Sequence, residues 1–341
     1  MDIVILAIES SCDETAAAVI CNGKILSNIV ATQEIHIKYG GVVPELASRA
    51  HQKNIVSIVN QALDKANITK NELNAVAFTQ GPGLLGALLV GVSFAKAFAW
   101  GLGIPFIAVN HMQAHILAHF IDEPSPKFPF ICLTVSGGHT QLVKVNDHLE
   151  MEIIGQTNDD AVGEAFDKTA KILGLSYPGG PLIDKYAQEG NPLAFKFPIV
   201  EMPNLDFSFS GIKTAFLYFI KDNIKTNPDF IQENLNDICA SIQYTLVQIL
   251  LKKIRKALKQ TGINTIAIAG GVSANKGLRS SLKNTAEIEG WDLYIPKFEY
   301  CTDNAAMIAI TAHYKYLKKD FATLETTPDP RMQFADILNK N

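Results

Sequence analysis

Short aliphatic runs alternate with longer segments of helical periodicity along the chain, and this alternation constrains the fold more than any other feature. Ile3–Ile8 is a continuous run of aliphatic residues, as in a strand covered on both faces. Similar runs recur at Ala75–Phe78, Pro105–Val109 and Pro129–Val135. Pro44 opens a segment in which apolar residues return every three or four positions, as in an amphipathic helix. The pattern predicts an α/β protein.

Composition narrows the class of protein. The chain has 341 residues, of which 48% are hydrophobic and 19% charged, with a net charge of −4. A chain of this kind buries a large core and is not disordered, and its length predicts about two domains. The near-neutral balance excludes nucleic-acid binding through overall charge, although a local basic patch remains compatible with it.

The cysteines indicate a reducing compartment. They are five in number and include no CxxC pair, which argues against a disulfide framework and against a cysteine zinc site. The apolar run near the N-terminus is too short for a signal peptide and follows no basic segment. We therefore expect a soluble, cytoplasmic protein.

One uncharged stretch, Ala75–Ala95, is long enough to span a bilayer. Gly81-Pro82-Gly83 interrupts it near the middle, and Thr79 and Gln80 would leave polar groups in lipid. The stretch is better explained by a buried strand, a tight turn and a buried helix, without a membrane.

A weak internal repeat links the two halves of the chain. VILAIESSCDETAAAVI begins at Val4, and ICLTVSGGHTQLVKV begins at Ile131; Thr15 and Thr140 occupy the same place in the two segments. A third strand, beginning at Thr265, leads through a glycine-rich turn into a helix. The repeat suggests a duplicated architecture with a ligand between the halves.

The GxGxxG match at Gly81–Gly86 does not indicate a dinucleotide site. That fingerprint needs an acidic residue about 20 positions further on to bind the ribose. No acidic residue occurs between Glu72 and Asp122. The glycines are better explained as a close packing contact between a helix and its strand.

A second motif, HMQAH from His111 to His115, is a candidate metal site. Asn110 is a plausible N-cap, so the two histidines lie one turn apart on one helix face, a spacing that suits two imidazole ligands. Asp303 is the best third ligand, in the first turn of a helix that Thr302 caps. For an isolated HxxxH, two structural histidines are the commoner case. The alternative for the aspartate is favourable placement of a carboxylate at a helix N-terminus.

Two glycine-rich turns could approach phosphate. Thr134–Gly138 follows a strand, and Gly270–Asn275 opens a helix whose N-terminus favours an anion. Asp167 and Asp184, near the PGG turn that ends at Gly180, could bind ribose hydroxyls, or could be ordinary helix and turn residues. The basic segments 251–259 and 315–319 are typical of solvated helix faces.

Seven collinear motifs resemble the TsaD/Gcp family, and the resemblance extends from Ile8 to Lys319. The matching segments are Gly40–His51, Thr79–Gly91, Asn110–His115, Thr134–Val143, Gly163–Pro181, Phe207–Thr214 and Ala269–Asn275. The resemblance implies the α/β fold of the actin-like ATPase (ASKHA) superfamily, with two ribonuclease-H-like domains around a nucleotide cleft. It implies an N-terminal domain over 1–128, to which a helix near 302–319 returns, a C-terminal domain over 129–301 with a helical insertion, and a tail over 320–341.

The resemblance also implies an activity: transfer of threonylcarbamoyl from threonylcarbamoyl-AMP to the exocyclic amine of adenosine 37 in tRNAs that read codons beginning with A. By motif match, His111, His115 and Asp303 bind a divalent metal, iron(2+) with zinc as the alternative. Glu14, in the CDET motif, takes a catalytic role. The adenine nucleotide is bound by Thr134, Val135, Ser136, Gly137, Gly138, Asp167, Gly180, Asp184 and Asn275.

The implied partners are tRNA, a TsaB-like paralogue and a TsaE-like ATPase, with a homodimer conceivable for the isolated chain. An activated acyl phosphate needs no protein nucleophile, so direct transfer is expected. The competing functions are an HxxxH metallopeptidase, which the absence of HExxH disfavours, a small-acid or sugar kinase of the same superfamily, and a nucleotide-binding scaffold without catalysis.

Overall fold

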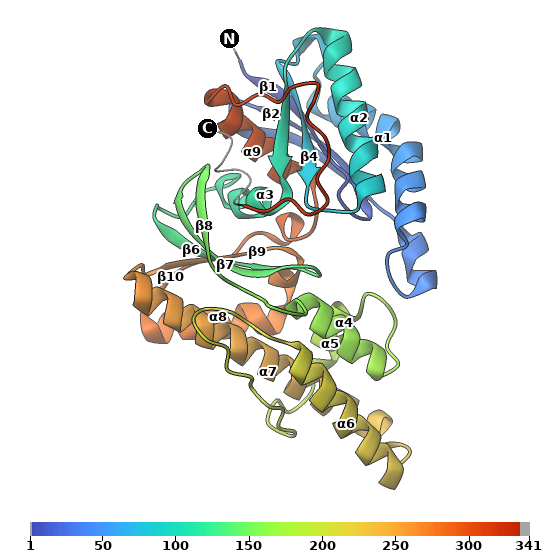
Figure 1. Cartoon of the computed structure of the whole chain (residues 1–341), viewed down its shortest axis with the longest axis vertical. Helices are drawn as coiled ribbons and strands as arrows, with labels where there is room; N and C mark the ends of the chain where they lie inside the picture. The colour runs from blue at the N-terminus through green and yellow to red at the C-terminus, as the bar shows by residue number, and fades with distance from the viewer. Residues whose placement is uncertain (1, 335–341) are drawn as a thin grey trace. The chain divides into compact units, whose positions relative to one another are not determined.

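β1 (Val4–Glu9) is the central strand of the first of two five-stranded sheets in the computed structural model, which describes residues 2–334. The strand order is β3-β2-β1-β4-β5 (Figure 1). β2 and β3 are antiparallel to their neighbours, whereas β1, β4 and β5 are parallel. The other strands are β2 (Glu14–Cys21), β3 (Lys24–Thr32), β4 (Ala75–Gly81) and β5 (Phe106–Asn110). Every residue of β1 is buried, as its aliphatic run predicted.

Helices cover both faces of this sheet. The long helix α1 (Pro44–Ala66) begins at its proline and buries the side chains that recur at helical spacing. It packs with α2 (Leu85–Leu102) over one face, while α9 (Ala305–Leu317) lies on the other (Figure 1). The short helix α3 (His111–Leu117) follows directly from β5.

The second sheet repeats the topology of the first. Its order is β8-β7-β6-β9-β10, so each strand has a counterpart in the first sheet, and the weak sequence repeat is a true structural duplication. Thr140, the match to Thr15, lies at the start of β7. The strands are β6 (Phe130–Val135), β7 (Thr140–Asp147), β8 (Glu150–Gln156), β9 (Thr265–Ala269) and β10 (Asp292–Tyr294).

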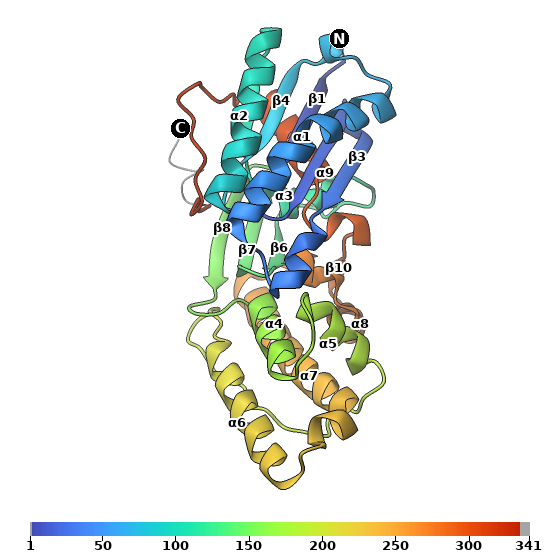
Figure 2. The same cartoon turned by 90° about the vertical axis from the view of Figure 1, so that its right-hand side faces the viewer.

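A helical layer packs against the second sheet. Its core joins strand residues to the buried phenylalanines Phe207, Phe209 and Phe216 and to the inner face of the longest helix, α7. Figure 2 shows α6 and α7 extending from the sheet beside one another. The helices are α4 (Val162–Ile172), α5 (Gly179–Ala187), α6 (Ser210–Thr226), α7 (Phe230–Thr261) and α8 (Lys276–Glu289). Short 3₁₀ turns lie at Glu34–Tyr39, Lys70–Glu72, Ala118–Phe120, Gly271–Ala274 and Phe298–Tyr300.

The described chain divides into two compact units. The first comprises residues 2–125, 146–152 and 296–334, and the second comprises 126–145 and 153–295. The segments 146–152 and 296–301, expected in the C-terminal domain, thus belong to the first unit, where Lys318 pairs with Asp147 and Lys297 with Asp122.

The segment expected as a C-terminal tail is partly integrated into the first unit. The backbone N–H of Asp329 donates to the carbonyl of Gln80 at 2.8 Å, and that of Ala322 donates to the carbonyl of Phe106 at 2.9 Å. These bonds attach the segment to the backbone of β4 and β5. Residues 335–341 of the expected tail lie outside the described residues.

The helix predicted from the uncharged stretch is less buried than expected. α2 is long and apolar enough, by length and composition alone, to cross a membrane, and one third of it is buried inside the protein. Ala87, Leu88 and Ala95 face the core, but Leu89 and Trp100 are exposed on the other side. One face of α2 is therefore buried and the other exposed, although both faces are apolar. Hydrophobic periodicity cannot reveal which face is buried when both are apolar.

Candidate metal centre and glycine loops

The two histidines of the HMQAH motif project from the first turns of α3, directly after a buried parallel strand. The side chain of Asn110 accepts hydrogen bonds from the backbone N–H groups of Met112 at 2.9 Å and Gln113 at 3.0 Å, so it caps the helix as predicted. His111 and His115 are both buried. The cap fixes the start of the helix and thereby the direction of both imidazoles.

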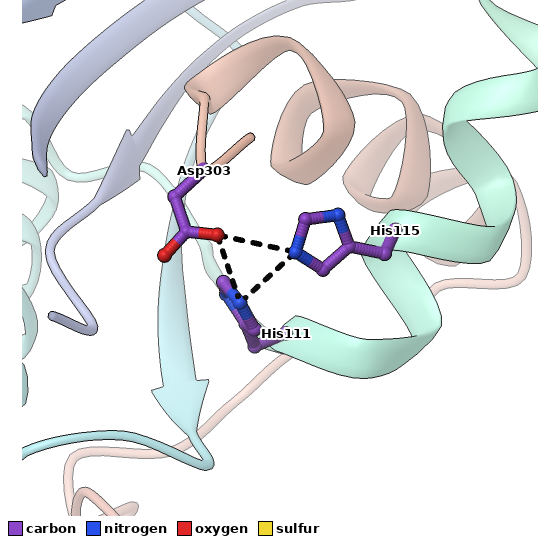
Figure 3. Close-up of side chains that lie close together, drawn as sticks. All are labelled: His111, His115 and Asp303. Atoms are coloured by element: carbon purple, nitrogen blue, oxygen red, sulfur yellow. Dashed lines mark hydrogen bonds and ion pairs between the residues drawn. The ribbon is translucent and has the colours of Figure 1, made fainter. Parts of the chain in front are cut away.

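Three ligand atoms converge at this point (Figure 3). The Nε2 atoms of His111 and His115 are 3.2 Å apart. The Oδ1 atom of Asp303 lies 3.3 Å from Nε2 of His111 and 3.2 Å from Nε2 of His115. The structure therefore brings together the three residues that the sequence proposed as metal ligands.

The position of Asp303 differs from the one predicted. It precedes α9, whose first residue is Ala305 and whose N-cap is Asn304 rather than Thr302. The Asn304 side chain accepts from the N–H of Met307 at 3.1 Å. Because Asp303 lies outside the first turn and its carboxylate points at the histidines, stabilisation of the helix N-terminus does not explain this residue.

The donor set fits a divalent transition metal. Two imidazole nitrogens and one carboxylate oxygen suit iron(2+) and zinc and leave coordination positions open. Ligands about 2.1 Å from one ion lie roughly 3.0–3.4 Å apart in octahedral or tetrahedral geometry, and the observed separations of 3.2 and 3.3 Å fall in that range. Both the residue types and the distances between their ligand atoms therefore fit a metal site.

The charges around the three ligands also favour a cation. Burial disfavours the charged form of His111, yet the carboxylates of Asp303 and Glu9 raise its pKa well above the ordinary value. Burial likewise opposes ionisation of Asp303, but His111 and His115 lower the pKa of this carboxyl. Burial lowers the pKa of His115, so its ring is neutral. The carboxylates of Glu9 and Asp303 thus lie close to the neutral imidazole of His115.

Glu9, which the sequence analysis did not single out, is bonded to the first histidine. Its side chain is fully buried at the end of β1. Oε2 lies 3.0 Å from Nδ1 of His111 and accepts a hydrogen bond from Oγ1 of Thr79 at 2.6 Å. Oε1 accepts from the backbone N–H of Ser11 at 2.5 Å. The sequence did offer a signal for Glu9: it is an acidic residue at the end of an aliphatic strand, directly before a polar turn.

Glu14 begins β2 near the same group of ionisable residues. Burial, followed by the charges of Asp303 and Asp13, raises the pKa of Glu14 to about 9. The turn before it is fixed by His51 of α1, whose Nε2 lies 3.0 Å from the carbonyl oxygen of Cys12. Nδ1 of His51 lies 2.8 Å from Oγ1 of Thr15. His51, the last residue of the GGVVPELASRAH motif, thus has a positioning role that its sequence did not reveal.

The glycine turn after β6 is open where the sequence proposed phosphate contacts. Nothing lies within 4 Å of the position that a Cβ would take at Gly137 or Gly138. Ser136 is half-buried, and its Oγ accepts from the N–H of His139 at 3.1 Å. Thr134 and Val135 are completely buried in β6. Of the five residues proposed in this segment, only the last three present groups to the surface.

Asp167 and Asp184 bind backbone amides in the second unit. Oδ1 of Asp167 accepts from the N–H groups of Gly179 at 2.9 Å and Gly180 at 3.0 Å. The two oxygens of Asp184 accept from the N–H groups of Lys276 at 3.0 Å and Gly277 at 3.1 Å. Both carboxylates therefore cap the N-terminal ends of helices α5 and α8, as in the alternative left open from the sequence.

Asn275 is the N-cap of α8. Its Oδ1 accepts from the N–H of Leu278 at 2.8 Å, and its Nδ2 donates to Oε1 of Gln243 at 2.7 Å. A Cβ at Gly277 would lie 2.2 Å from Nε2 of Gln243. These contacts tie the glycine turn after β9 to the long helix α7.

The basic part of α7 has structural partners. Nζ of Lys253 donates to the carbonyls of Met202 at 2.8 Å and Asn204 at 3.0 Å, and Lys256 donates to the carbonyl of Asn204 at 2.8 Å. Arg255 pairs with Glu289 at 2.6 Å. This face of α7 therefore anchors a loop, and Lys253 is buried there rather than solvated as its sequence suggested.

Comparison with known proteins extends these observations. The family model described as "TsaD: tRNA N6-adenosine threonylcarbamoyltransferase" matches residues 24–310. A Cytophaga hutchinsonii protein named tRNA N6-adenosine threonylcarbamoyltransferase is 66% identical over 338 residues, which cover 99% of this chain and 98% of that protein. A Christiangramia forsetii protein of the same name is 66% identical over 333 residues, covering 97% and 98%.

Solved structures share the fold at low sequence identity. Full-length HypF in its phosphate- and nucleotide-bound form aligns with a TM-score of 0.62 at 13% identity, covering 92% of this chain and 46% of HypF. Component A of (R)-2-hydroxyglutaryl-CoA dehydratase from Acidaminococcus fermentans aligns with a TM-score of 0.52 at 13% identity, covering 93% and 99%. With the duplicated sheets, these similarities identify the actin-like ATPase fold.

Proposed function

This chain belongs to the tRNA N6-adenosine threonylcarbamoyltransferase family, and we propose that it transfers threonylcarbamoyl from threonylcarbamoyl-AMP to the exocyclic amine of adenosine 37 in tRNAs that read codons beginning with A. The observation that carries the proposal is the convergence of His111, His115 and Asp303 in a chain that matches the family over almost its whole length. In the transfer, the amine nitrogen forms a bond to the carbamoyl carbon, the bond from that carbon to the phosphate oxygen breaks, and AMP leaves with the electron pair.

His111, His115 and Asp303 hold the divalent metal in this proposal. Iron(2+) is the proposed ion and zinc the alternative, because both accept two imidazoles and a carboxylate. The metal supplies Lewis-acid polarisation of a substrate oxygen when bound. His111 and His115 lie in α3, which follows β5, and Asp303 lies in the turn before α9, so β5 and that turn set the geometry before any substrate binds.

The second unit binds the adenylate part of the donor. Backbone amides of Ser136, Gly137 and Gly138 contact the phosphate, and the openness around both glycines supports this role. Asp167 and Asp184 orient the N-terminal turns of α5 and α8 and retain lone pairs for the ribose hydroxyls, beside Gly180 and Asn275. Thr134 and Val135 are completely buried in β6, so their proposed contribution is to hold the glycine turn that follows them.

Glu14 is the proposed proton acceptor. The adenosine amine must lose one proton as its bond to carbon forms, and a buried carboxyl whose pKa is raised to about 9 is, once ionised, a stronger base than an ordinary glutamate. No covalent enzyme intermediate is needed, because the mixed anhydride is already activated. Detection of a threonylcarbamoyl-protein adduct under turnover would contradict direct transfer.

Replacing Glu14 with Gln is expected to lower the rate of the transfer step about 10²-fold or more, with metal content and AMP affinity unchanged. Because the raised pKa keeps the wild-type carboxyl largely protonated at pH 7, the reactive carboxylate increases toward pH 9, and so does the wild-type rate. The rate of the variant lacks this rise. Single-turnover rates from pH 6.5 to 9 test the prediction; parallel pH profiles would exclude Glu14 as the proton acceptor.

The proposed partners are tRNA, a TsaB-like paralogue and a TsaE-like ATPase, and the proposed location is the cytoplasm. Peptide hydrolysis is a weaker alternative, because the position after His111, where a zinc peptidase helix carries its glutamate base, is the buried, apolar Met112. The histidines therefore have metal-binding geometry without the base of a peptidase.

The decisive experiment combines the purified chain with threonylcarbamoyl-AMP and unmodified tRNA, with and without the partner proteins. Mass spectrometry of the digested tRNA is expected to detect threonylcarbamoyladenosine, and a second assay measures AMP release. Absence of product in every mixture, with folded and metal-loaded protein, would overturn the proposal. ATP-dependent phosphorylation of small acids or sugars would favour the kinase alternative instead.

A further inference from the structure

We infer that Glu9 is a positioning residue that fixes the His111 ring with its proton on Nδ1 and its Nε2 lone pair directed at the metal. This inference rests on the proposed metal role of His111, and it concerns a residue that is not among the three converging ligands. Glu9 is buried at the end of β1, and its Oε2 is 3.0 Å from Nδ1 of His111. An ionised carboxylate only accepts hydrogen bonds, so the ring nitrogen beside it must carry the proton.

The other partners of Glu9 are also hydrogen-bond donors, as an ionised carboxylate requires. The hydroxyl of Thr79 donates to Oε2 at 2.6 Å, so that oxygen accepts one hydrogen bond besides that of the ring. The backbone N–H of Ser11 donates to Oε1 at 2.5 Å. An amide N–H cannot become an acceptor, so Oε1 must remain an acceptor as well. Each oxygen of Glu9 thus accepts a hydrogen bond from a donor other than His111, as expected of an ionised carboxylate.

The two histidines differ in this respect. Nδ1 of His115 is buried and makes no hydrogen bond to another described residue, whereas Nδ1 of His111 faces a fixed carboxylate. Outer hydrogen bonds of this kind set the tautomer and orientation of metal-binding imidazoles. Of the two histidines, His111 is therefore the one whose ring is held by a hydrogen bond to a carboxylate. That carboxylate, Glu9, belongs to β1 and is more than 100 residues away in sequence.

Replacing Glu9 with Gln is a sharp test, because the amide has nearly the same shape but one donor end. The oxygen of the glutamine amide must face the N–H of Ser11 to accept its hydrogen bond. The NH₂ group of the amide then faces His111 and Thr79. The NH₂ donates to Nδ1 of His111, so the ring proton moves to Nε2, where it opposes metal binding. The reverse orientation would place two donors, the amide NH₂ and the N–H of Ser11, against each other.

We expect E9Q to weaken Zn²⁺ binding by about 10- to 100-fold in a competition titration with a chromophoric chelator. Thr79→Val is the matched control: it removes one hydrogen bond from Glu9 but keeps the carboxylate beside the ring, so Zn²⁺ affinity stays within about threefold. Both variants are checked for thermal unfolding. An E9Q affinity within twofold of wild type, or equal losses in E9Q and T79V, would overturn the inference.

A second measurement does not depend on the variant folding. In wild-type protein labelled with ¹⁵N-histidine and loaded with Zn²⁺, the His111 signals, assigned by their loss in H111A, are expected to show a proton on Nδ1 and the metal on Nε2. A proton on Nε2 would overturn the inference. Because neither measurement uses tRNA or the acyl donor, failure of the proposed transferase activity would be recognised separately.

Discussion

The double variant His111→Ala, His115→Ala is expected to lose bound metal and to lower threonylcarbamoyl transfer by at least about 10³-fold. The reason is geometric: one carboxylate remains of three ligands that lie 3.2 and 3.3 Å apart, and a single carboxylate does not retain a divalent transition metal. Metal content by elemental analysis and product by mass spectrometry measure the two effects on one preparation.

His119→Ala is the matched control for this variant. His119 lies one turn beyond His115 in the 3₁₀ turn after α3 and is similarly buried, but it is not among the three converging ligands. The control is expected to keep its metal and its activity. Full activity in the metal-depleted double variant would show that the three residues have no catalytic role, and retention of the metal would place the ion elsewhere.

The composition of this metal site could be predicted from the sequence only in part. HxxxH spacing and an Asn cap suffice to place two imidazoles on one helix face, because both depend on local helix geometry. Asp303 is 188 residues from His115, so local rules could nominate it but could not orient it. The local rule in fact misplaced it, since Asn304 rather than Thr302 caps α9.

The residues that support the site were harder to predict for a related reason. Glu9 lies in a strand whose aliphatic run ends in a polar turn, and only parallel pairing of β1 with β4 brings Thr79 beside it. His51 approaches the CDET turn because α1 packs on β2. Such contacts depend on tertiary packing, whereas the alternation of strands and helices depends on local burial and was predictable.

The adenylate loops illustrate a different limit. The glycine-rich turns could be located from residue type alone. Asp167 and Asp184, however, bind backbone amides, and the presence of an aspartate does not show whether its carboxylate binds an amide or a ribose hydroxyl. The duplication explains the position of these turns: the glycine turn after β9 is the counterpart of the one after β4. Repeated topology, rather than motif matching, thus relates the rejected GxGxxG segment to a proposed nucleotide loop.

Replacing Gly163 with Ala is the second change for which we expect a large effect. A Cβ at this position in α4 would lie 2.4 Å from the carbonyl oxygen of Ser136 and 2.9 Å from Cα of Gly137. Backbone cannot yield as a flexible side chain would, so the Ser136–Gly138 turn must shift, at a cost of about 1–3 kcal/mol. If that turn binds the adenylate, AMP affinity measured by calorimetry falls about 10- to 100-fold.

Gly101→Ala provides the matched control, because it makes the same substitution in α2, where nothing lies within 4 Å of the new Cβ. Alanine has the higher helix propensity, so this control is expected to gain up to about 1 kcal/mol of stability and to leave AMP binding unchanged. Gly163→Ala should also retain its metal, because the three metal ligands belong to the other compact unit. Normal AMP affinity in a folded Gly163→Ala protein would mean that the Ser136–Gly138 turn is not part of the adenylate site. A parallel loss of metal would instead mean that the substitution disrupts the chain generally and says nothing specific about nucleotide binding.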